Sequence, residues 1–536
     1  MTQTQGSAER GASTQPPPWW ESRWLAVALI VLSAVPLLYP PNPPLVDLLG
    51  HMGRYRVELD LEHSATLQQY YGYHWAAIGN LGVDLLVKVL GPLVGLELAV
   101  KLIILAIPPL TVAGFLWVAR EVHGRVPPTA WFAIPFVYGH PFLFGFVNFA
   151  LSMALAFLAF GLWLRLGRLG KQRLRELVFV PISLIVFFTH AYGWGALGLL
   201  CFSAEAVRQH DRGIGWVKAG SIAALQASVM LLPLLAMVIW RSETHGSETA
   251  DWFNWNAKMV WLKTALRDRW HWFDLGSLAA IGLVLLEALR NPRLTFSRNL
   301  AFSALVLIAG FLLLPRIIFG SAYADMRLVP YFIAVLLLAV RFRGEIPRRF
   351  GQGLAVLALT FVIVRLGSNT ISLGMSARDQ AVKLHALDHI EPGARVVSFV
   401  GLRCGLVWEL SRNSHLGAMV IVRREGFSNE QWLMDGLNQL EIKYRTPGVY
   451  AYDPSEVVRP NQCPDSLHHA IDVALGHLPH EAFDYVWLID PPPFDPQLTQ
   501  GMTLVWSATG TALYRINRDG AGSPPATPRT ASAPAR

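Results

Sequence analysis

A carboxylate, an imidazole and a guanidinium lie close together in the sequence, at Asp47, His51 and Arg54. Carboxylates and imidazoles can accept or donate protons during a reaction, and a guanidinium can bind an anionic group. His51 comes one helical turn after Asp47, so the two side chains share a face if this segment is helical. All three residues follow the first long apolar segment. They therefore predict a reactive site at the mouth of the structure that the apolar segments form.

The composition indicates that these segments lie in a membrane. Of the 536 residues, 53% are hydrophobic and only 15% are charged, whereas about 25% of the residues in a soluble domain are charged. The formal net charge is +8. However, the basic residues lie between apolar segments rather than on one folded face, which excludes nucleic acid as a partner. The partner that the composition predicts is the lipid bilayer.

Eleven apolar segments predict membrane-spanning helices. The first has no small-residue cleavage site behind it, so it predicts a retained helix rather than a signal peptide. Residues 1–23 predict a disordered cytoplasmic N-terminus. The helical membrane domain then covers 24–373, with a long first outer loop over 41–96. The predicted spans are 24–40, 97–118, 129–146, 148–165, 177–190, 193–208, 217–240, 273–290, 299–316, 327–341 and 353–373.

The basic residues predict how the helices are oriented. Cytoplasmic loops carry an excess of Lys and Arg, and four basic connections fall on one side if the N-terminus is cytoplasmic. An odd number of spans then places the C-terminal part on the periplasmic face of a bacterial inner membrane. This count treats 76–95 as an amphipathic helix on the outer surface. The four connections are marked by Arg165, Arg168, Lys171, Arg173 and Arg175; Arg208, Arg212 and Lys218; Arg290, Arg293 and Arg298; and Arg341, Arg343, Arg348 and Arg349.

The region after the last span predicts a folded domain. Residues 374–518 alternate between strand and helix patterns, which favours an extracytoplasmic α/β domain. Residues 519–536 are rich in Pro, Ala and Ser and predict a disordered tail. The predicted elements are helices at 377–389 and 467–478, strands at 395–400, 418–422 and 485–489, and a hairpin within 502–516.

Two of the cysteines fall in this outer domain. Cys201 lies in a predicted span, whereas Cys404 and Cys463 lie after the last span. A disulfide is permitted outside the cytoplasm, but the sequence alone does not determine pairing. A Cys404–Cys463 disulfide and two free thiols are therefore both open.

Polar residues from distant segments fall near the outer ends of the predicted spans. Ionisable groups in membrane segments are costly and usually functional, so this convergence predicts a polar cavity that opens outward. Individual members also have structural interpretations, since Asp325 and Arg327 can pair and His140 can end a helix before Pro141. The set consists of Asp47, His51, Arg54, His140, Asn148, His190, Arg316, Asp325 and Arg327.

Several of these features resemble the GT-C superfamily of integral membrane glycosyltransferases. They are an acidic residue, Asp47, in a long first outer loop, surface helices at 61–69 and 76–95 in that loop, and an α/β domain after the last span. Two further segments resemble the family, Gly145-Phe146-Val147-Asn148-Phe149 before a helix and Ala324-Asp325-Met326-Arg327-Leu328-Val329-Pro330 at a late span. Many members carry a paired acid in the first loop, whereas here Leu48 follows Asp47.

The resemblance implies transfer of a sugar from a polyprenyl phosphate or diphosphate to an acceptor on the outer face. Asp47 would act as the general base in a single, inverting displacement, and His51 would orient it or contact the phosphate. Guanidinium groups would bind the phosphate. No metal cofactor is favoured, since the first-loop histidines match no ligand motif. The remaining substrate-binding candidates are Arg54, Lys88, His140, Asn148, His190, Arg316, Asp325 and Arg327.

Two other classes of protein are alternatives. A multi-pass transporter would have inverted repeats and polar groups at the midplane, whereas this chain has no convincing repeat and its polar residues favour the outer edge. A non-catalytic membrane scaffold related to GT-C enzymes is the second alternative, because the paired acid is absent.

Overall fold

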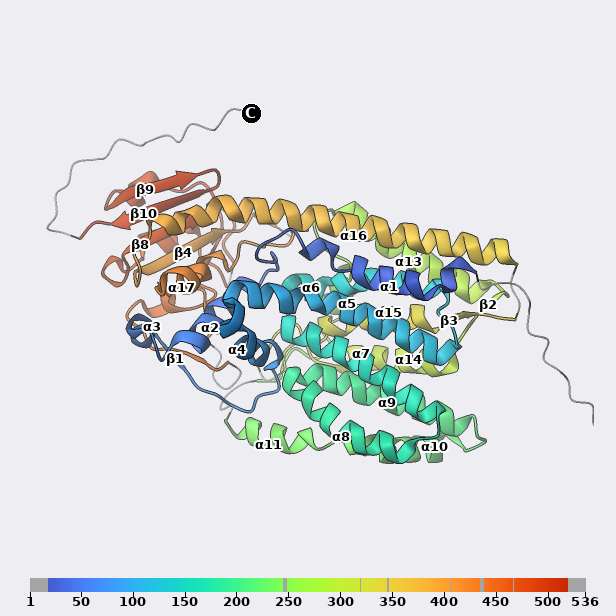
Figure 1. Ribbon diagram of the computed structural model, residues 1–536. Coiled ribbons are helices and arrows are strands. Elements are labelled where there is room, and N and C mark those ends of the chain that lie inside the picture. Colours follow the sequence, from blue (N-terminus) through green and yellow to red (C-terminus); the bar gives the residue numbers. More distant parts are fainter. Residues whose placement is uncertain are drawn as a thin grey trace, which may run out of the picture.

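The structure is a computed structural model in which an α/β domain lies at one end of a helical bundle (Figure 1). It describes residues 18–243, 248–318, 320–344, 347–405, 407–433, 438–465 and 467–518. The predicted disordered tail, 519–536, and most of the predicted disordered N-terminus lie outside these residues. Helix α16 (Arg348–Leu384) runs along the bundle and reaches the α/β domain.

Four described helices are long and apolar enough to cross a membrane. They are α5 (Leu96–His123), α7 (Val147–Arg168), α13 (His271–Arg290) and α16 with the turn that follows it. This agrees with the predicted polytopic helical class. The shorter helices of the bundle are α1 (Arg23–Leu32), α6 (His140–Phe144), α8 (Gln172–Thr189), α9 (Ala191–His210), α10 (Trp216–Ala227), α11 (Pro233–Glu243), α12 (Trp255–Lys263), α14 (Arg298–Leu313) and α15 (Val329–Ala339).

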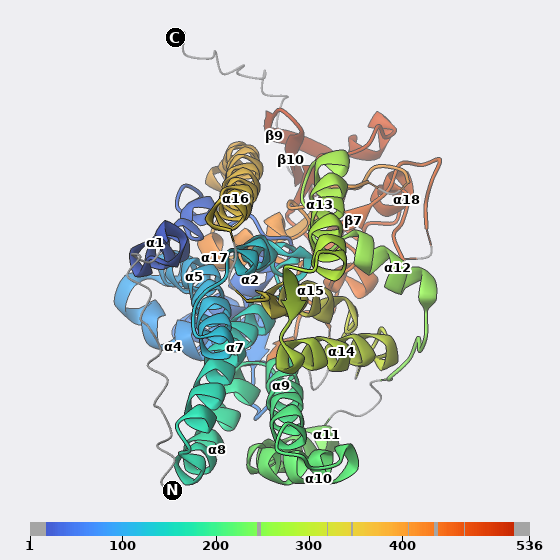
Figure 2. The same ribbon diagram turned by 90° about the vertical axis from the view of Figure 1, so that its right-hand side faces the viewer.

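Proline changes two of the predicted spans. The segment predicted as a span at 129–146 forms a 3-10 helix, Pro128–Tyr138, followed by the short α6. Pro135 and Pro141 lack a backbone N–H and each remove an α-helical hydrogen bond, although α5 accommodates Pro108 and Pro109. The predicted span 217–240 is likewise divided into α10 and α11 before Pro233. Helices α8 to α11 group on the side of the bundle opposite α16 (Figure 2).

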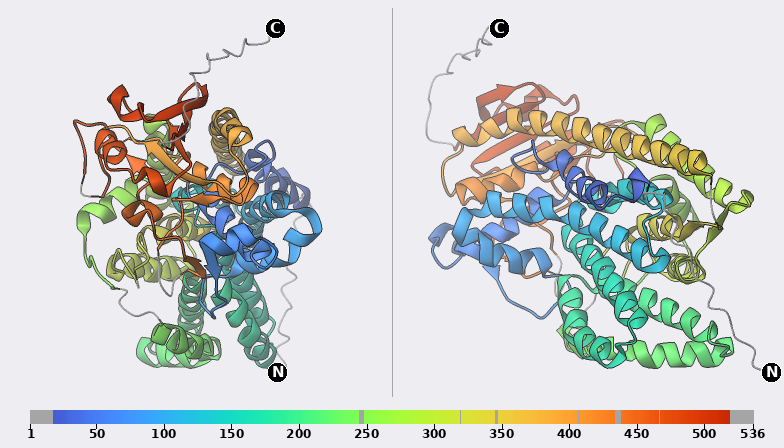
Figure 3. Two further views of the ribbon diagram at one scale, coloured as in Figure 1. Left: turned by 90° about the vertical axis from the view of Figure 1, so that its left-hand side faces the viewer. Right: turned by 45° about the vertical axis from the view of Figure 1, so that its right-hand side comes forward.

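The first outer loop joins the C-terminal domain rather than lying free on the surface. It contains α2 (Leu48–Asp60), α3 (Ala65–Tyr70), β1 (Tyr71–Tyr73) and α4 (Gly82–Val94). Strand β1 pairs antiparallel with β6 (Leu440–Ile442), and α2 packs on α17 (Met419–Arg424). Figure 3 shows these first-loop elements beside the α/β domain. Asp47, directly before α2, is therefore held between the bundle and that domain.

A mixed sheet forms the centre of the α/β domain. Its strands lie in the order β5 (Phe427–Ser428), β4 (Arg395–Gly401), β8 (Tyr485–Ile489), β10 (Thr511–Ile516) and β9 (Met502–Ala508). The first three run parallel, and β10 is antiparallel to both of its neighbours. Strand β7 (Val457–Val458) also pairs with β4. Elsewhere, β2 (Leu294–Phe296) pairs with β3 (Val340–Phe342).

Most predicted elements of this domain are present, with two corrections. The strands at 395–400 and 485–489 and the terminal hairpin were predicted, and the helix at 377–389 is the end of α16 and its following turn. The predicted strand at 418–422 is instead helical, since it lies within α17 and the preceding turn. A short buried apolar run does not distinguish a strand from a helix. The predicted helix at 467–478 is shorter, α18 (Ile471–Gly476).

A buried ion pair and a hydrogen bond connect the domain to the bundle. Arg412 bonds to Asp268 at 2.5 Å, and the Trp408 indole N–H donates at 2.7 Å to Asp274 of α13, which also pairs with Arg365 of α16. Breaking such a pair leaves an uncompensated charge, which costs several kcal/mol. These contacts fix the position of the segment that precedes α17.

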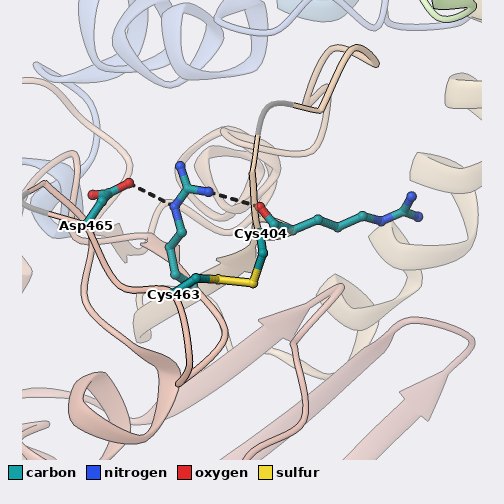
Figure 4. Close-up of a disulfide and its surroundings, with 5 residues drawn as sticks. Cys404, Cys463 and Asp465 are labelled. Atoms are coloured by element: carbon teal, nitrogen blue, oxygen red, sulfur yellow. Dashed lines mark hydrogen bonds and ion pairs between the residues drawn. A yellow bond between two sulfur atoms is a disulfide. The ribbon is translucent and has the colours of Figure 1, made fainter.

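Cys404 and Cys463 form a disulfide next to this segment (Figure 4). Arg459 donates hydrogen bonds to the Asp465 carboxylate and to the Arg403 carbonyl, each at 2.9 Å. The disulfide and these bonds hold two loops of the α/β domain together. Cys201 is a buried free thiol in α9.

Candidate active site

A cavity of about 1540 Å³ lies between the helical bundle and the α/β domain. Six of the residues predicted from the sequence line it, namely Asp47, His51, Arg54, Asn148, His190 and Arg327. The α/β domain contributes Arg403, Arg412, His415, Trp432, Asp453 and Glu456. Residues far apart in the sequence therefore meet in one space, and apolar side chains from α9 and from the segment after α14 form part of its wall.

The Asp47 carboxylate is directed into this cavity without a structural role of its own. Asp47 is the N-cap residue of α2, a position whose side chain normally bonds to the helix, but its side chain makes no such bond. The side chain is 13% exposed, and Oδ1 lies 3.8 Å from Nε2 of His415. Burial raises the pKa of Asp47 to about 7; His415 and Arg327 lower it, while Asp453 raises it further. A base that titrates near neutral pH is suited to proton transfer.

Backbone contacts set the position of Asp47. Its N–H donates to the Phe144 carbonyl at 2.9 Å. Gly145, in the segment that resembled GT-C proteins, has φ +104°, and a Cβ there would lie 2.6 Å from the Asp47 nitrogen. Only glycine adopts this conformation readily and leaves room for the approach.

We predict that Gly145→Ala displaces Asp47 and lowers by about 100-fold the rate of a reaction in which the Asp47 carboxylate takes part, because misplacing a catalytic group by about 1 Å has an effect of that size. The measurement is the initial rate of that reaction with equal amounts of membrane-inserted protein. Gly124→Ala is the matched control, since Gly124 also has positive φ, +75°, but nothing within 4 Å of its added Cβ. Equal rates for the two variants would contradict the role of Gly145.

Arg54 and Asn148 line the cavity but are already paired. Arg54 Nη2 lies 2.8 Å from Oδ1 of buried Asp84, and Asn148 Nδ2 donates to the other oxygen of Asp84 at 3.0 Å. Asn148 Oδ1 also accepts from the Val83 N–H at 2.5 Å. These bonds join α2, α4 and α7. These bonds hold the first loop in position. A phosphate that bound to Arg54 would have to compete with Asp84 for the guanidinium.

Arg327 has a different environment. Its guanidinium lies over the rings of Phe146 and Tyr192, at 4.5 and 5.1 Å from their centroids, and it donates to Ser321 Oγ at 3.2 Å. The residue is only 6% exposed. No carboxylate among the described residues forms an ion pair with it, although buried charges are normally paired. Arg327 is therefore a buried cation with capacity to bind an anion.

His51 and His190 line the same cavity. The His51 ring contacts Trp432 of the α/β domain at a tilt, with centroids 4.9 Å apart, and the His51 backbone N–H donates to the Asp47 carbonyl. The predicted shared face of Asp47 and His51 is therefore present. His190 Nδ1 accepts from the Tyr192 N–H at 3.1 Å, next to Arg327.

Four predicted site residues lie away from the cavity lining, each with a protein partner. Arg316 pairs with Asp251 at 3.2 Å, and Lys88 donates to the Glu58 carbonyl at 3.3 Å. His140 Nδ1 lies 3.2 Å from Thr264 Oγ1. Asp325 pairs at 3.1 Å with Lys258, so the alternative in which it pairs with Arg327 is wrong. Lys258 reaches it from the connection between α11 and α13, a contact that no local pattern predicts.

The α/β domain places acidic and imidazole groups beside Asp47 that were not predicted from the sequence. His415 Nδ1 lies 3.3 Å from Glu430 Oε2, and the rings of Trp432 and His415 contact each other at a tilt, with centroids 4.7 Å apart. Burial lowers the pKa of His415, but its interactions with Glu430, Asp453 and Asp47 raise it to about 9. Glu430 follows the end of parallel strand β5, where α/β domains place their sites, but β5 is only two residues long and was not predicted.

The fold and the cavity together define a helical membrane bundle with a polar cavity beneath an α/β domain. Two solved structures similar to it are of ArnT from Cupriavidus metallidurans. The apo structure has a TM-score of 0.45 and 13% identity, with 92% of this chain and 97% of that chain covered. The structure bound to undecaprenyl phosphate has a TM-score of 0.46 and 12% identity, with 94% and 98% covered. No family model and no curated protein sequence matches the chain.

Proposed function

We propose that this protein is a membrane glycosyltransferase that moves a sugar from a polyprenyl phosphate or diphosphate to an acceptor at the outer face of a bacterial inner membrane. One observation carries the proposal. The carboxylate of Asp47, which makes no helix-capping bond, and the guanidinium of Arg327, which has no ion-pair partner among the described residues, line the same cavity, near enough for the Arg327 charge to lower the pKa of Asp47. A base and an anion-binding group are the two elements that glycosyl transfer from a phosphate requires.

In this proposal the donor phosphate binds at Arg327. The guanidinium can donate two parallel hydrogen bonds to phosphate oxygens, and the Phe146 and Tyr192 rings hold it in place. The apolar part of the cavity, which includes Leu199 and Leu314, suits the isoprenoid tail. As the bond from the anomeric carbon to the phosphate oxygen breaks, negative charge grows on the phosphate and strengthens its interaction with Arg327.

The acceptor then enters from the side of the α/β domain, next to Asp47. Its hydroxyl oxygen attacks the anomeric carbon, and its proton passes to the Asp47 carboxylate. The new glycosidic bond forms as the bond to phosphate breaks, so the anomeric configuration inverts. His51 and His415 flank Asp47 from two elements and keep its carboxylate facing the cavity.

The test combines a strain that lacks the gene with purified protein in lipid nanodiscs. We expect the strain to lose one envelope glycan modification in mass spectra, and we expect the wild-type gene to restore it. In nanodiscs, the protein should bind polyprenyl phosphate and convert a polyprenyl-phosphate sugar in the presence of an envelope extract. Unchanged glycans together with no binding of polyprenyl phosphate would contradict the proposal and favour the transporter or scaffold alternative.

A further inference from the structure

Polar side chains from three segments meet at one edge of strand β4, between the places where β5 and β7 pair with it. Strands β5 and β7 pair with the same edge of β4, near Arg395 and near Val400, and the chain between them leaves the sheet. Glu430 follows β5 directly, and Glu456 precedes β7. His415 reaches the same place from the turn before α17. The three residues are buried, being 0%, 1% and 5% exposed, in the order Glu430, Glu456, His415.

Several polar atoms of these side chains are buried without a hydrogen bond, although His415 Nδ1 and Glu430 Oε2 lie 3.3 Å apart as an ion pair. Both carboxylate oxygens of Glu430, one oxygen of Glu456 and Nδ1 of His415 are buried without a hydrogen-bond partner among the described residues. Buried polar groups are almost always satisfied, and a buried carboxylate is costly unless it is paired or coordinates a metal. One atom from each residue lies within 4.8 Å of the others. The arrangement therefore places three potential ligand atoms around a common point.

We propose that His415, Glu430 and Glu456 bind a divalent transition-metal ion at the junction of the α/β domain and the cavity. An imidazole nitrogen with two carboxylates is a ligand set for ions such as Zn²⁺ and Mn²⁺. His415 and Glu456 line the cavity, which gives an ion a path from the outside. This binding is independent of the proposed transfer reaction and is measurable without it.

Close packing keeps the ligands in place. A Cβ on Gly417 would lie 1.9 Å from Ser398 Oγ and 2.5 Å from Glu430 Oε1, so only glycine lets the turn after His415 approach β4. Asn429 accepts from the Ser398 N–H at 2.9 Å, and the Val400 N–H donates to the Glu456 carbonyl at 2.6 Å. The segments that carry the two carboxylates are therefore fixed by backbone bonds to one strand. Such support from surrounding residues is what a metal site requires.

The ion would also act on Asp47 through His415. A histidine that binds metal through Nδ1 is neutral and keeps its proton on Nε2, and this nitrogen faces Asp47 Oδ1 at 3.8 Å. Metal ligands commonly donate their second ring N–H to a carboxylate. His415 would then be a positioning residue for Asp47, fixed in orientation and tautomer by the metal.

The test uses the full chain in nanodiscs, purified without a polyhistidine tag and stripped with a chelator. Zn²⁺ or Mn²⁺ alone is then added, and bound metal is measured by elemental mass spectrometry, with Mn²⁺ affinity measured by electron paramagnetic resonance. We expect one ion per chain and a higher melting temperature on binding. Glu430→Gln and Glu456→Gln should each weaken binding at least tenfold. Glu58→Gln, which removes a buried carboxylate outside the cluster, should leave it unchanged.

Two results would overturn the proposal. One is wild-type protein that binds neither ion at millimolar concentration, and the other is Gln variants that bind as tightly as wild type. Gln matches Glu in size and keeps a polar side chain at each position, so we expect these variants to fold in the absence of metal. If one of them fails to fold, the metal-dependent change in the melting temperature of the wild-type protein still decides the question.

Discussion

Asp47→Asn is expected to lower the rate of sugar transfer by about 10²- to 10⁴-fold, the usual contribution of a general base. Asparagine has nearly the same size and leaves the backbone bond to Phe144 intact, but its amide cannot accept the acceptor proton. The Asp47 side chain has no capping bond to lose, so the effect should fall on the rate rather than on folding. Binding of polyprenyl phosphate should change little, because that group is assigned to Arg327.

The measurement is the single-turnover transfer rate in nanodiscs, together with envelope glycans from a strain that carries only the variant gene. Asp60→Asn is the matched control, since Asp60 ends the same helix and pairs with Arg56, and its side chain is 32% exposed. The control should transfer sugar at the wild-type rate. A wild-type rate for Asp47→Asn, in cells whose null strain has a glycan defect, would show that another group accepts the proton.

The sequence predicts those elements whose signals are local. The strands at 395–400 and 485–489 are continuous apolar runs, and the terminal hairpin turns at Gly510, whose φ is +71°. The apolar run at 418–422 has the same local appearance and yet is helical, because its neighbours rather than its composition decide its conformation. The span predicted at 129–146 contains Pro135 and Pro141, but prolines alone do not decide the conformation, since α5 continues through Pro108 and Pro109.

The sequence also predicts part, but not all, of the candidate site. Its depth near the outer ends of the spans follows from topology, so Asp47, His190 and Arg327 could be grouped without a structure. The sequence does not show which charged side chains lack an ion-pair partner, because each partner comes from a distant segment. Asp84 neutralises Arg54 and Lys258 neutralises Asp325, whereas Arg327 is left with aromatic rings. His415 lies beside Asp47 because the first loop pairs with the C-terminal domain. Local sequence patterns do not show how segments so far apart in the chain pair.

Because these arginines have different environments, we expect a large effect on ligand binding when Arg327 is replaced. Arg327→Met is expected to weaken binding of polyprenyl phosphate by about 10- to 150-fold, which corresponds to the loss of about 1.5–3 kcal/mol from hydrogen bonds to a charged group. Methionine has a similar length and can pack against Phe146 and Tyr192. No described carboxylate loses its ion-pair partner, so the melting temperature should stay near that of the wild type. Arg327→Lys should recover part of the affinity, because it keeps the charge but not the bidentate geometry.

Two further arginines provide the controls for this experiment. Arg316→Met should bind the lipid as the wild type does, since Arg316 lies outside the cavity lining and pairs with Asp251. Arg54→Met should instead lower stability, by about 3–5 kcal/mol, because it leaves buried Asp84 without its partner. Lipid binding in nanodiscs and thermal unfolding, measured on all three Met variants, separate a ligand-binding arginine from a structural one. If Arg327→Met loses stability but keeps its affinity for the lipid, Arg327 is structural and the phosphate must bind elsewhere in the cavity.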